Sequence, residues 1–490
     1  MLQQRKYGLF PRIIGKGDNG KRLADLLIRM RTEVAAGEPP SNAGPSFLGL
    51  APSTSIDSLI IIDREVDFPT VLLTQLTYEG LIDEVFNISA NQTEVDSSVI
   101  GGAAPQPGQT GSASTSMKRK ILIDPKDTLY ADLGDSNFAI VGTLLNKSAR
   151  RLQSSTERHS LASKTTSELR DFVARLPGYQ AEQASLKLHT SLAEEIIKHT
   201  RSDTFTRALE VQQNLMSGAD PSTQTDLITE LIDRGTPLPT VLRLLCLSST
   251  TNAGIRPKDL ESFKRSLIHA YGPQHILTLS SLEKMSLLTP RGGATLSGGT
   301  GSAVKPGSVT NYTPLRKTLR LWDDEVNEAN PNDISYTFSG YAPLSVRIVQ
   351  SIIQKTTLAN TIKPPAPNTN TNTPPPSNPL AQNLRIFEDS AKYIRGATFN
   401  EVQTGDTVLS QKALKARQML SGHGEQGKTV VVFFLGGVTR AEIAALRWVG
   451  RRLGEEGGEG RGCRIVVAAT NVLTGEGLVG SAIEKGRFKA

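Results

Sequence analysis

Residues Ser58–Asp63 read SLIIID, a short continuous run of aliphatic and β-branched side chains. Two similar runs, Val430–Leu435 (VVVFFL) and Arg464–Thr470 (RIVVAAT), lie near the other end of the chain. Runs of this kind are typical of strands in parallel sheets that are covered on both faces. Helical patterns lie beside them, at Lys21–Glu33 and Ala441–Leu453. The sequence therefore predicts an α/β domain whose parallel sheet is built from both chain ends.

The middle of the chain, from about Ala149 to Arg395, has a different pattern. Apolar residues recur there at steps of three and four, which indicates amphipathic helices. Gly218 and Gly235 each follow such a segment, and glycine readily takes the left-handed conformation that ends a helix. We expect a mainly helical domain inserted into the α/β domain. The predicted boundaries assign residues 1–148 and 425–490 to the α/β domain and residues 149–424 to the helical domain.

Four segments are too polar, and too rich in small residues, to bury the apolar surface that would offset the entropy of ordering them. We expect them to be loops. They are residues 101–117, 290–310, 363–379 and 454–462. The third is rich in proline, which favours an extended linker of polyproline type.

The composition excludes several classes of protein. The chain has 490 residues, 38% hydrophobic and 21% charged, and its formal net charge of +7 is spread without a basic stripe, so we expect no nucleic-acid partner. Cys246 and Cys463 are too few for a disulfide framework or a cysteine zinc site, which favours a reducing, intracellular compartment. No apolar run reaches the roughly 18 residues that a membrane helix needs. The first residues, MLQQRKYGLFPRIIGKG, have no apolar stretch of signal-peptide length, so we expect no secretion.

The segment GKGDNGKR, which contains Gly15, Gly17 and Gly20, matches part of a phosphate-binding loop. Such a loop needs a strand before it and a hydroxyl residue after its lysine. Pro11 weakens the preceding strand, and Arg22 occupies the hydroxyl position. A nucleotide-binding enzyme that uses the Gly15–Lys21 loop stays an alternative to a glycine-rich turn before a helix.

A second turn, LGGVTRAE, follows the strand that contains VVVFFL. Thr439 and Glu442 have the spacing of a capping box, in which each side chain bonds an amide at the start of a helix. The functional alternative is an anion site at that helix terminus.

Three carboxylates, Asp63, Glu65 and Asp67, follow the SLIIID strand at its carboxyl end, where α/β enzymes often carry acidic groups. Arg64 lies among them and favours a structural ion-pair turn over a metal or acid–base site. The six histidines lack metal-ligand spacing, and there is no nucleophile-elbow motif. We therefore predict no catalytic residue, no metal and no cofactor.

The segment SLIIIDREVDFPTVLLTQLTYEGLIDEVFNI, Ser58–Ile88, resembles the SM proteins, the Sec/Munc-type family that assists SNARE assembly. Further segments, among them LHTSLAEEIIKHT, YGPQHILTLSSLEK and VVVFFLGGVTRAEIAALRWV, are similar to the vacuolar branch of that family. That branch is the class C vacuolar protein sorting subunit shared by the HOPS and CORVET tethering complexes.

The resemblance implies three domains: an N-terminal α/β domain, a second α/β domain in two stretches, and a helical domain inserted between those stretches. This chain begins near the start of the second domain, so the resemblance implies that the N-terminal domain is lacking. The low-complexity insertions also depart from the family pattern.

The resemblance implies binding to SNAREs rather than catalysis. Ordering a disordered segment costs about 1 to 2 kcal/mol per residue, so a folded surface that aligns SNARE helices would lower the barrier to bundle formation. The candidate surface is the pair of segments Leu186–Lys198 and Asp203–Met216. The expected core-facing residues are Leu192, Ile196, Phe205, Leu209 and Leu215, and the candidate SNARE-binding residues are His189, Glu195, Gln212 and Gln213. The alternative is that both segments only pack inside the helical domain.

The second implied contact is with a tether subunit whose C-terminal helical repeats dock on this family. The resemblance maps that surface to Lys264, Tyr271, Pro273, His275 and Ile276. Pro273 departs from the aromatic residue that relatives can carry, which removes an anchor of the kind that dominates interface energy. The alternative is that Tyr271 and Ile276 belong to the core.

These implications predict a non-enzymatic protein that templates SNARE assembly as a subunit of the HOPS and CORVET tethers. The expected location is cytoplasmic, with peripheral and indirect attachment to vacuole, lysosome and late endosome membranes. A further alternative is a truncated fragment that retains only docking to the partner subunit.

Overall fold

The structure is a computed structural model. It describes residues 8–36, 53, 55–97, 99, 118–158, 166–291, 309–353, 389–403, 429–456 and 463–483. Of the predicted loops, residues 101–117 and 363–379 lie outside the described residues, as do most of 290–310 and 454–462.

A five-stranded sheet forms the centre of the α/β part, with the strand order β5-β1-β2-β6-β7. Its strands are β1 (Arg12–Lys16), β2 (Ile56–Asp63), β5 (Thr398–Val402), β6 (Thr429–Leu435) and β7 (Arg464–Ala469). Strands β1, β2, β6 and β7 are parallel, and β5 pairs with β1 antiparallel. The central pair joins the two chain ends, with Ile60 opposite Val432. The predicted fold class, a parallel sheet built from both chain ends, is therefore confirmed.

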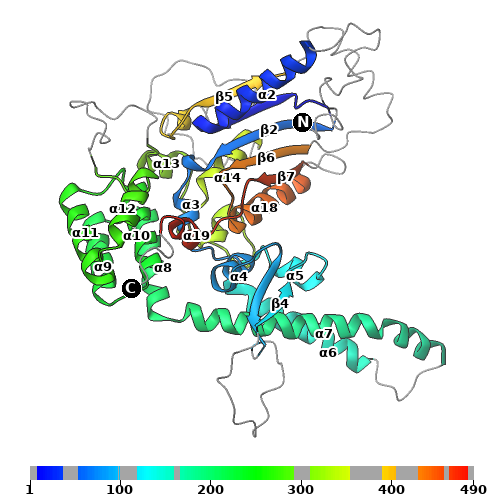
Figure 1. Cartoon of the computed structure of the whole chain (residues 1–490). Helices are drawn as coiled ribbons and strands as arrows, with labels where there is room; N and C mark the ends of the chain where they lie inside the picture. The colour runs from blue at the N-terminus through cyan, green and yellow to red at the C-terminus, as the bar shows by residue number, and fades with distance from the viewer. Residues whose placement is uncertain are drawn as a thin grey trace, which may run out of the picture.

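The two faces of the sheet pack against different helices (Figure 1). On one face, Ile60, Ile62 and Phe434 belong to the largest core, which also contains residues of α14 (Leu344–Ile353) and α18 (Arg440–Glu456). On the other face, Ile13 and Ile61 pack in a smaller core with Ala24 of α2 (Asp18–Ala36) and Phe399 of β5.

A second unit follows β2 and lies below the sheet in Figure 1. Its elements are η2 (Arg64–Val66), α3 (Pro69–Leu72), α4 (Tyr78–Phe86), β3 (Gln92–Asp96), β4 (Lys118–Leu122), α5 (Thr128–Leu133), α6 (Phe138–Arg158) and α7 (Thr166–Thr200). Strands β3 and β4 pair antiparallel, and α7 packs beside α6, α4 and α5 around a separate core. Helix α7 extends far from the sheet as a long rod.

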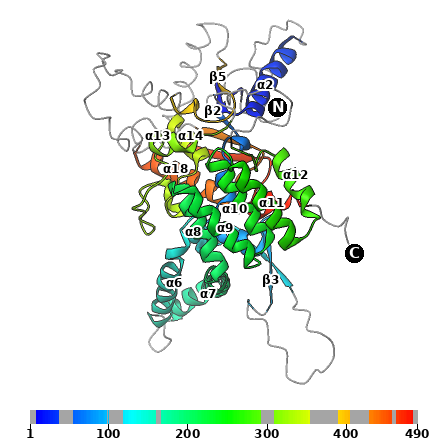
Figure 2. The same ribbon diagram turned by 90° about the vertical axis from the view of Figure 1, so that its left-hand side faces the viewer.

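The following helices form a bundle at one side of the sheet, and this bundle faces the viewer in Figure 2. They are α8 (Asp203–Ser217), α9 (Pro221–Asp233), α10 (Leu238–Thr251), α11 (Pro257–Tyr271) and α12 (His275–Lys284). The remaining elements are α13 (Tyr312–Thr318), η4 (Ile334–Phe338) and α19 (Gly475–Gly480). Gly218, directly after α8, and Gly235, two residues after the end of α9, have positive φ angles of 92° and 70°, as predicted for residues that end helices.

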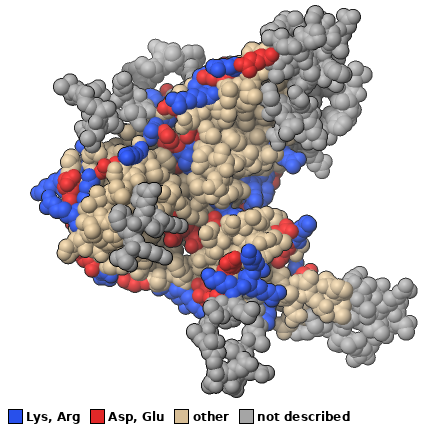
Figure 3. Space-filling view, in the orientation of Figure 1, with Lys and Arg blue, Asp and Glu red and all other residues tan. Residues whose placement is uncertain are grey.

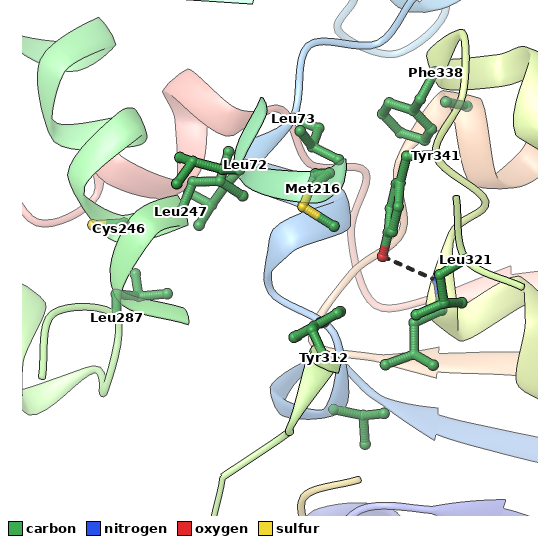
Figure 4. Close-up of a cluster of buried hydrophobic side chains, with 14 of the residues drawn as sticks. Leu72, Leu73, Met216, Cys246, Leu247, Leu287, Tyr312, Leu321, Phe338 and Tyr341 are labelled. Carbon is green, nitrogen blue, oxygen red and sulfur yellow. Dashed lines mark hydrogen bonds between the residues drawn. The ribbon is translucent and has the colours of Figure 1, made fainter. Parts of the chain in front are cut away.

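Aromatic and aliphatic side chains join the bundle to the sheet unit (Figure 4). Leu73, which follows α3, lies beside Met216 of α8, and Leu72, the last residue of α3, lies near Leu247 of α10. Tyr341 lies between Phe338 and Tyr312, and its hydroxyl accepts a hydrogen bond from the Leu344 amide at 3.3 Å. The bundle and the sheet therefore share one continuous core.

Two strands differ from the sequence prediction. Strand β1 begins directly after Pro11, so this proline precedes the strand and does not prevent it from pairing. Strand β5 lies within the stretch that the sequence assigned to the helical domain, and the predicted boundary after residue 148 falls inside α6. The division into domains stays a prediction.

Candidate partner-binding surfaces

The glycine turn before α2 is filled by protein atoms. A β-carbon on Gly15 would lie 2.0 Å from the Ile61 carbonyl oxygen, and one on Gly17 would lie 2.1 Å from the Asp63 β-carbon. The Asp63 carboxylate accepts a hydrogen bond from the Asn19 amide at 3.0 Å, so it occupies the helix terminus where a phosphate would bind. The glycines thus permit close packing, which favours the structural interpretation of this turn.

The lysines of this turn also have protein partners. Lys16 is buried, and its Nζ donates to the carbonyl oxygens of Ala391 at 2.9 Å and Gly396 at 2.6 Å. Burial lowers the pKa of Lys16 to about 8. Lys21 forms an ion pair with Glu401 of β5 at 3.1 Å. Both lysines therefore hold the segment that contains β5 against β1 and α2.

The acidic turn after β2 is the centre of a buried network. Arg64 Nη1 lies 2.9 Å from Glu442 Oε2, and both side chains are almost fully buried. Burial by itself lowers the pKa of Arg64, but Glu442 and Asp67 offset this, so the pKa lies above its ordinary value. Asp67 also accepts hydrogen bonds from the Tyr312 hydroxyl at 3.0 Å and the Ser345 amide at 2.9 Å. These contacts favour an ion-pair turn over a metal or acid–base site.

The predicted capping box is present at the start of α18. Glu442 accepts a hydrogen bond from the Thr439 amide at 2.8 Å, and Thr439 Oγ1 accepts one from the Glu442 amide at 3.2 Å. The same carboxylate binds Arg64 and accepts a hydrogen bond from the Ser345 hydroxyl. Because Glu442 already binds these groups, this helix terminus is closed to an external anion.

His189 of α7 lies inside the structure, contrary to the outward orientation that the sequence analysis gave it. It is 2% exposed, and its Nδ1 lies 2.9 Å from the Tyr78 hydroxyl. Its Nε2 lies 3.4 Å from Asp127 Oδ2, which also accepts a hydrogen bond from Ser185 at 2.6 Å. The hydrogen bond from His189 is the largest of the effects that hold the pKa of Asp127 below its ordinary value. His189 therefore anchors α7 to α4 and α5.

Gln212 of α8 is also buried, at 2% exposure, and its Oε1 accepts a hydrogen bond from the Thr74 amide at 2.8 Å. Sequence periodicity identified the helix but not the neighbour that covers this side chain. Glu195 and Gln213 are only partly buried, and Glu195 pairs with Lys198 at 2.7 Å. Of the four candidates, Glu195 and Gln213 thus remain accessible to a partner, and their contact with SNAREs stays a prediction.

The expected core residues of these helices divide into two groups. Leu192, Ile196 and Leu215 are 0%, 0% and 1% exposed, as predicted. Phe205 and Leu209 are only partly buried. Leu209 and Gln213 lie beside Trp322 at a shallow crevice between α8 and the segment before η4.

The five candidate docking residues lie together on α11, the turn after it and the start of α12. Lys264 of α11 forms an ion pair with Glu283 of α12 at 2.8 Å. The Tyr271 hydroxyl donates to the Thr236 carbonyl oxygen, so this ring is partly packed. Their role in docking stays a prediction.

The outer part of this surface is apolar. Pro273 is exposed, and His275 is partly buried with its Nδ1 3.3 Å from Thr278 Oγ1. Ile276 is 53% exposed, which excludes the core interpretation for it. The sequence analysis missed Leu277, which is 44% exposed beside Ile276. The signal for it was the pair of adjacent aliphatic residues in the first turn of a short helix.

Within the described residues, none of the helices is long and apolar enough to cross a membrane. The same part of the chain contains no group of three or more His, Cys, Asp or Glu side chains arranged to hold a metal ion.

Comparison with known proteins defines the class of this protein. The Sec1 family model matches residues 1–481, and the chain therefore belongs to the Sec1 family. It is 35% identical over 486 residues to vacuolar protein sorting-associated protein 33A of Rattus norvegicus, covering 99% of this chain and 70% of the relative. It is 32% identical over 482 residues to the vacuolar protein-sorting-associated protein 33 homolog of Arabidopsis thaliana, covering 98% of this chain and 69% of the relative.

Solved structures support the same fold. The Unc18–syntaxin 1 complex from Monosiga brevicollis matches with a TM-score of 0.56 and 15% identity, covering 99% of this chain and 70% of that chain. The SM protein Vps45 in complex with the Qa SNARE Tlg2 (1–310) matches with a TM-score of 0.51 and 14% identity, covering 98% of this chain and 66% of that chain. At these identities the likeness concerns the fold alone.

Family membership supplies the function class. Sec1 family proteins are non-enzymatic regulators of SNAREs, which confirms the prediction that this chain is not an enzyme.

Proposed function

We propose that this chain binds SNARE proteins and templates their assembly as a subunit of HOPS- and CORVET-type tethers at vacuole and late endosome membranes. The observation that carries the proposal is the similarity to vacuolar protein sorting-associated proteins 33 over 99% of the chain. The proposal includes a cytoplasmic location with indirect membrane attachment through partner proteins.

The SNARE-binding part of the proposal concerns α7 and α8. Buried contacts of His189 and Gln212 fix both helices to the unit after β2, which makes their outer faces rigid. Glu195 and Gln213 stand on those faces and supply hydrogen-bonding groups to an amphipathic partner helix. A rigid surface binds with less loss of conformational entropy than a mobile one, and this favours templating.

The first test is the substitution Glu195→Lys, measured by the rate at which labelled cytosolic SNARE helices of the late endosome form a four-helix bundle. We expect the wild-type chain to accelerate SNARE assembly. The variant should lose most of that acceleration, because the charge at position 195 in the contact changes from negative to positive. Glu194→Lys is the matched control, since Glu194 is the exposed neighbour on the same helix. Equal rates for the two variants would contradict a contact at Glu195.

The docking part of the proposal concerns the surface of Lys264, Tyr271, Pro273, His275 and Ile276. We expect Ile276→Asp to weaken binding to a C-terminal helical-repeat fragment of the partner tether subunit at least about tenfold, because a carboxylate would replace an apolar anchor. Leu122→Asp is the control, since Leu122 is similarly exposed, at 59%, on β4. Calorimetry measures both affinities, and an unchanged affinity for Ile276→Asp would exclude this surface.

The two tests also distinguish the proposed function from the alternative of a fragment that only docks to the partner subunit. A chain that binds the tether fragment but does not accelerate SNARE assembly would behave as a fragment that retains docking alone.

A further inference from the structure

The crevice between α8 and the segment before η4 has an apolar floor. Figure 4 shows Leu73 and Met216 on one side of it and Phe338 and Tyr341 on the other, and all four side chains are buried. The crevice contains about 220 Å³ of space, part of it open to solvent. Pockets for small molecules have about 300 to 1,000 Å³, so this crevice is better matched to a side chain of a protein partner.

The rim of the crevice presents a fixed aromatic ring beside an aliphatic side chain. Leu209 and Gln213 of α8 and Trp322 opposite them are only partly buried. The Trp322 ring donates a hydrogen bond through Nε1 to Asp324 Oδ1 at 2.7 Å. It also packs on Gly340, where a β-carbon would lie 3.1 Å from the ring. A partly exposed tryptophan in a fixed orientation is typical of residues that anchor a protein partner.

The crevice also contains an amide group that lacks a partner. Gln212 lines the crevice and is 2% exposed, and its Oε1 accepts the hydrogen bond from the Thr74 amide at 2.8 Å. Among the described residues, its Nε2 has no acceptor, and the neighbouring side chain of Gln213 has no hydrogen bond. An almost buried donor without an acceptor is unfavourable. A carbonyl oxygen of a bound segment would satisfy it.

The segment next to the crevice is acidic. Residues 323–328, DDEVNE, follow Trp322 directly and contain four carboxylates and no basic residue; we call them the acidic loop. The first carboxylate pairs with Arg320 at 3.1 Å, whereas Asp324 and Glu325 are exposed and have no cationic partner among the described residues. The whole chain has a formal net charge of +7, and Figure 3 shows basic and acidic side chains interspersed over the bundle. A local negative surface on a basic protein favours a positively charged partner.

We propose that the crevice and the acidic loop bind a basic segment of a partner protein. One apolar side chain of that segment lies against Leu209 and Trp322, and one of its carbonyl oxygens accepts a hydrogen bond from Gln212. Its lysine or arginine side chains face Asp324 and Glu325. The inference goes beyond the proposed function, because the acidic loop belongs neither to the SNARE-binding helices nor to the tether-docking surface.

The test selects binding sequences from a displayed library of short random peptides on the immobilised 490-residue chain. We expect the selected peptides to combine a large apolar residue with several lysines or arginines, and to bind less tightly as the salt concentration rises. Glu325→Lys and Leu209→Asp should each weaken their binding at least about tenfold, because the first repels the basic residues and the second places a carboxylate against the apolar anchor. Glu33→Lys makes the same charge change at an exposed position of α2, and it should bind these peptides like the wild-type chain.

Glu325→Lys keeps the test decisive if Leu209→Asp disturbs α8, because Glu325 is exposed. Glu195→Lys, the variant designed to impair SNARE assembly, should bind the selected peptides like the wild-type chain, so the two proposals can fail separately. The absence of enriched sequences, a selection of acidic sequences, or equal binding to the wild-type chain and Glu325→Lys would each overturn the proposal. Binding that Glu195→Lys abolishes would also overturn it, because the peptides would then occupy the SNARE-binding surface.

Discussion

At the scale of single residues, His189 and Asp127 show how a polar contact fixes the long helix α7. The His189 ring is enclosed by Tyr78 and Tyr130, with ring centroids 5.8 Å and 5.9 Å away. Asp127 also caps α5, by accepting hydrogen bonds from the Leu129 and Tyr130 amides. One carboxylate thus connects the start of α5 to α7, so its removal affects both helices.

We expect Asp127→Asn to lower the free energy of unfolding at pH 7 by about 1 to 3 kcal/mol, because a charge-assisted contact to a buried ring is lost. The pKa of Asp127 lies below its ordinary value in the folded chain. Its stabilising effect is therefore complete above about pH 4, the range of an unfolded aspartate, and disappears as the pH falls through the lower folded pKa.

Urea denaturation of the wild-type chain and the variant at several pH values measures this effect, and the difference should shrink below about pH 4. Asp124→Asn is the control, because Asp124 accepts a local hydrogen bond from the Lys126 amide at 3.0 Å. A pH-independent difference between the wild-type chain and Asp127→Asn would contradict the role of the charge.

At the scale of elements, Glu442 joins three segments that are far apart in the sequence. It caps α18, pairs with Arg64 in η2 and accepts a hydrogen bond from Ser345 in α14. A buried ion pair adds little net stability compared with apolar residues, but removal of one partner leaves the other charge unpaired. This carboxylate therefore fixes the orientation of three elements at the carboxyl end of β2.

We expect Glu442→Gln to lower the free energy of unfolding by about 3 to 5 kcal/mol, because Arg64 would stay buried without its main counter-charge. Glu65→Gln is the control, since Glu65 is partly exposed and pairs with Arg395 at 2.8 Å outside the buried network. Chemical denaturation followed by circular dichroism measures the free energy of unfolding of both variants. Similar decreases for the two would show that burial of Arg64 is not the cause.

At the scale of the whole molecule, Arg243 of α10 ties the bundle to the second unit. Its guanidinium donates to the Leu72 and Leu73 carbonyl oxygens and pairs with Glu84 of α4 at 2.8 Å. Gly475, at the start of α19, packs against the same guanidinium. This contact brings the C-terminal segment, the bundle and the second unit together at one point.

We expect Gly475→Ala to lower the free energy of unfolding by about 1 to 3 kcal/mol, because a β-carbon there would lie 2.2 Å from Arg243 Nε. The arginine cannot move aside without losing its three partners. Gly480→Ala is the control in the same helix, because a β-carbon there meets nothing within 4 Å. Thermal unfolding compares the two, and a neutral Gly475→Ala would mean that Arg243 is free to shift.

The fold class was predictable from the sequence because SLIIID, VVVFFL and RIVVAAT are continuous apolar runs, the pattern that strands of a parallel sheet leave in a sequence. Strand β5 was not, since TFNEV is a short edge strand that exposes alternate side chains. The inward orientation of His189 and Gln212 was also beyond the sequence, because Tyr78 and Thr74, which cover them, are more than a hundred residues away. Periodicity identifies a helix, but the neighbours of its polar side depend on tertiary structure.

The pairing of β2 with β6 sets the order in which the chain can fold during synthesis. Ile60 of β2 cannot pair until Val432 of β6 has been synthesised. A ribosome that adds about 5 to 20 residues per second needs about 20 to 70 s to make the residues between them. For that time the aliphatic strand β2 is without its central neighbour, whereas the bundle can form from local contacts. Nascent chains of this protein should therefore depend on chaperones until the last strands leave the ribosome.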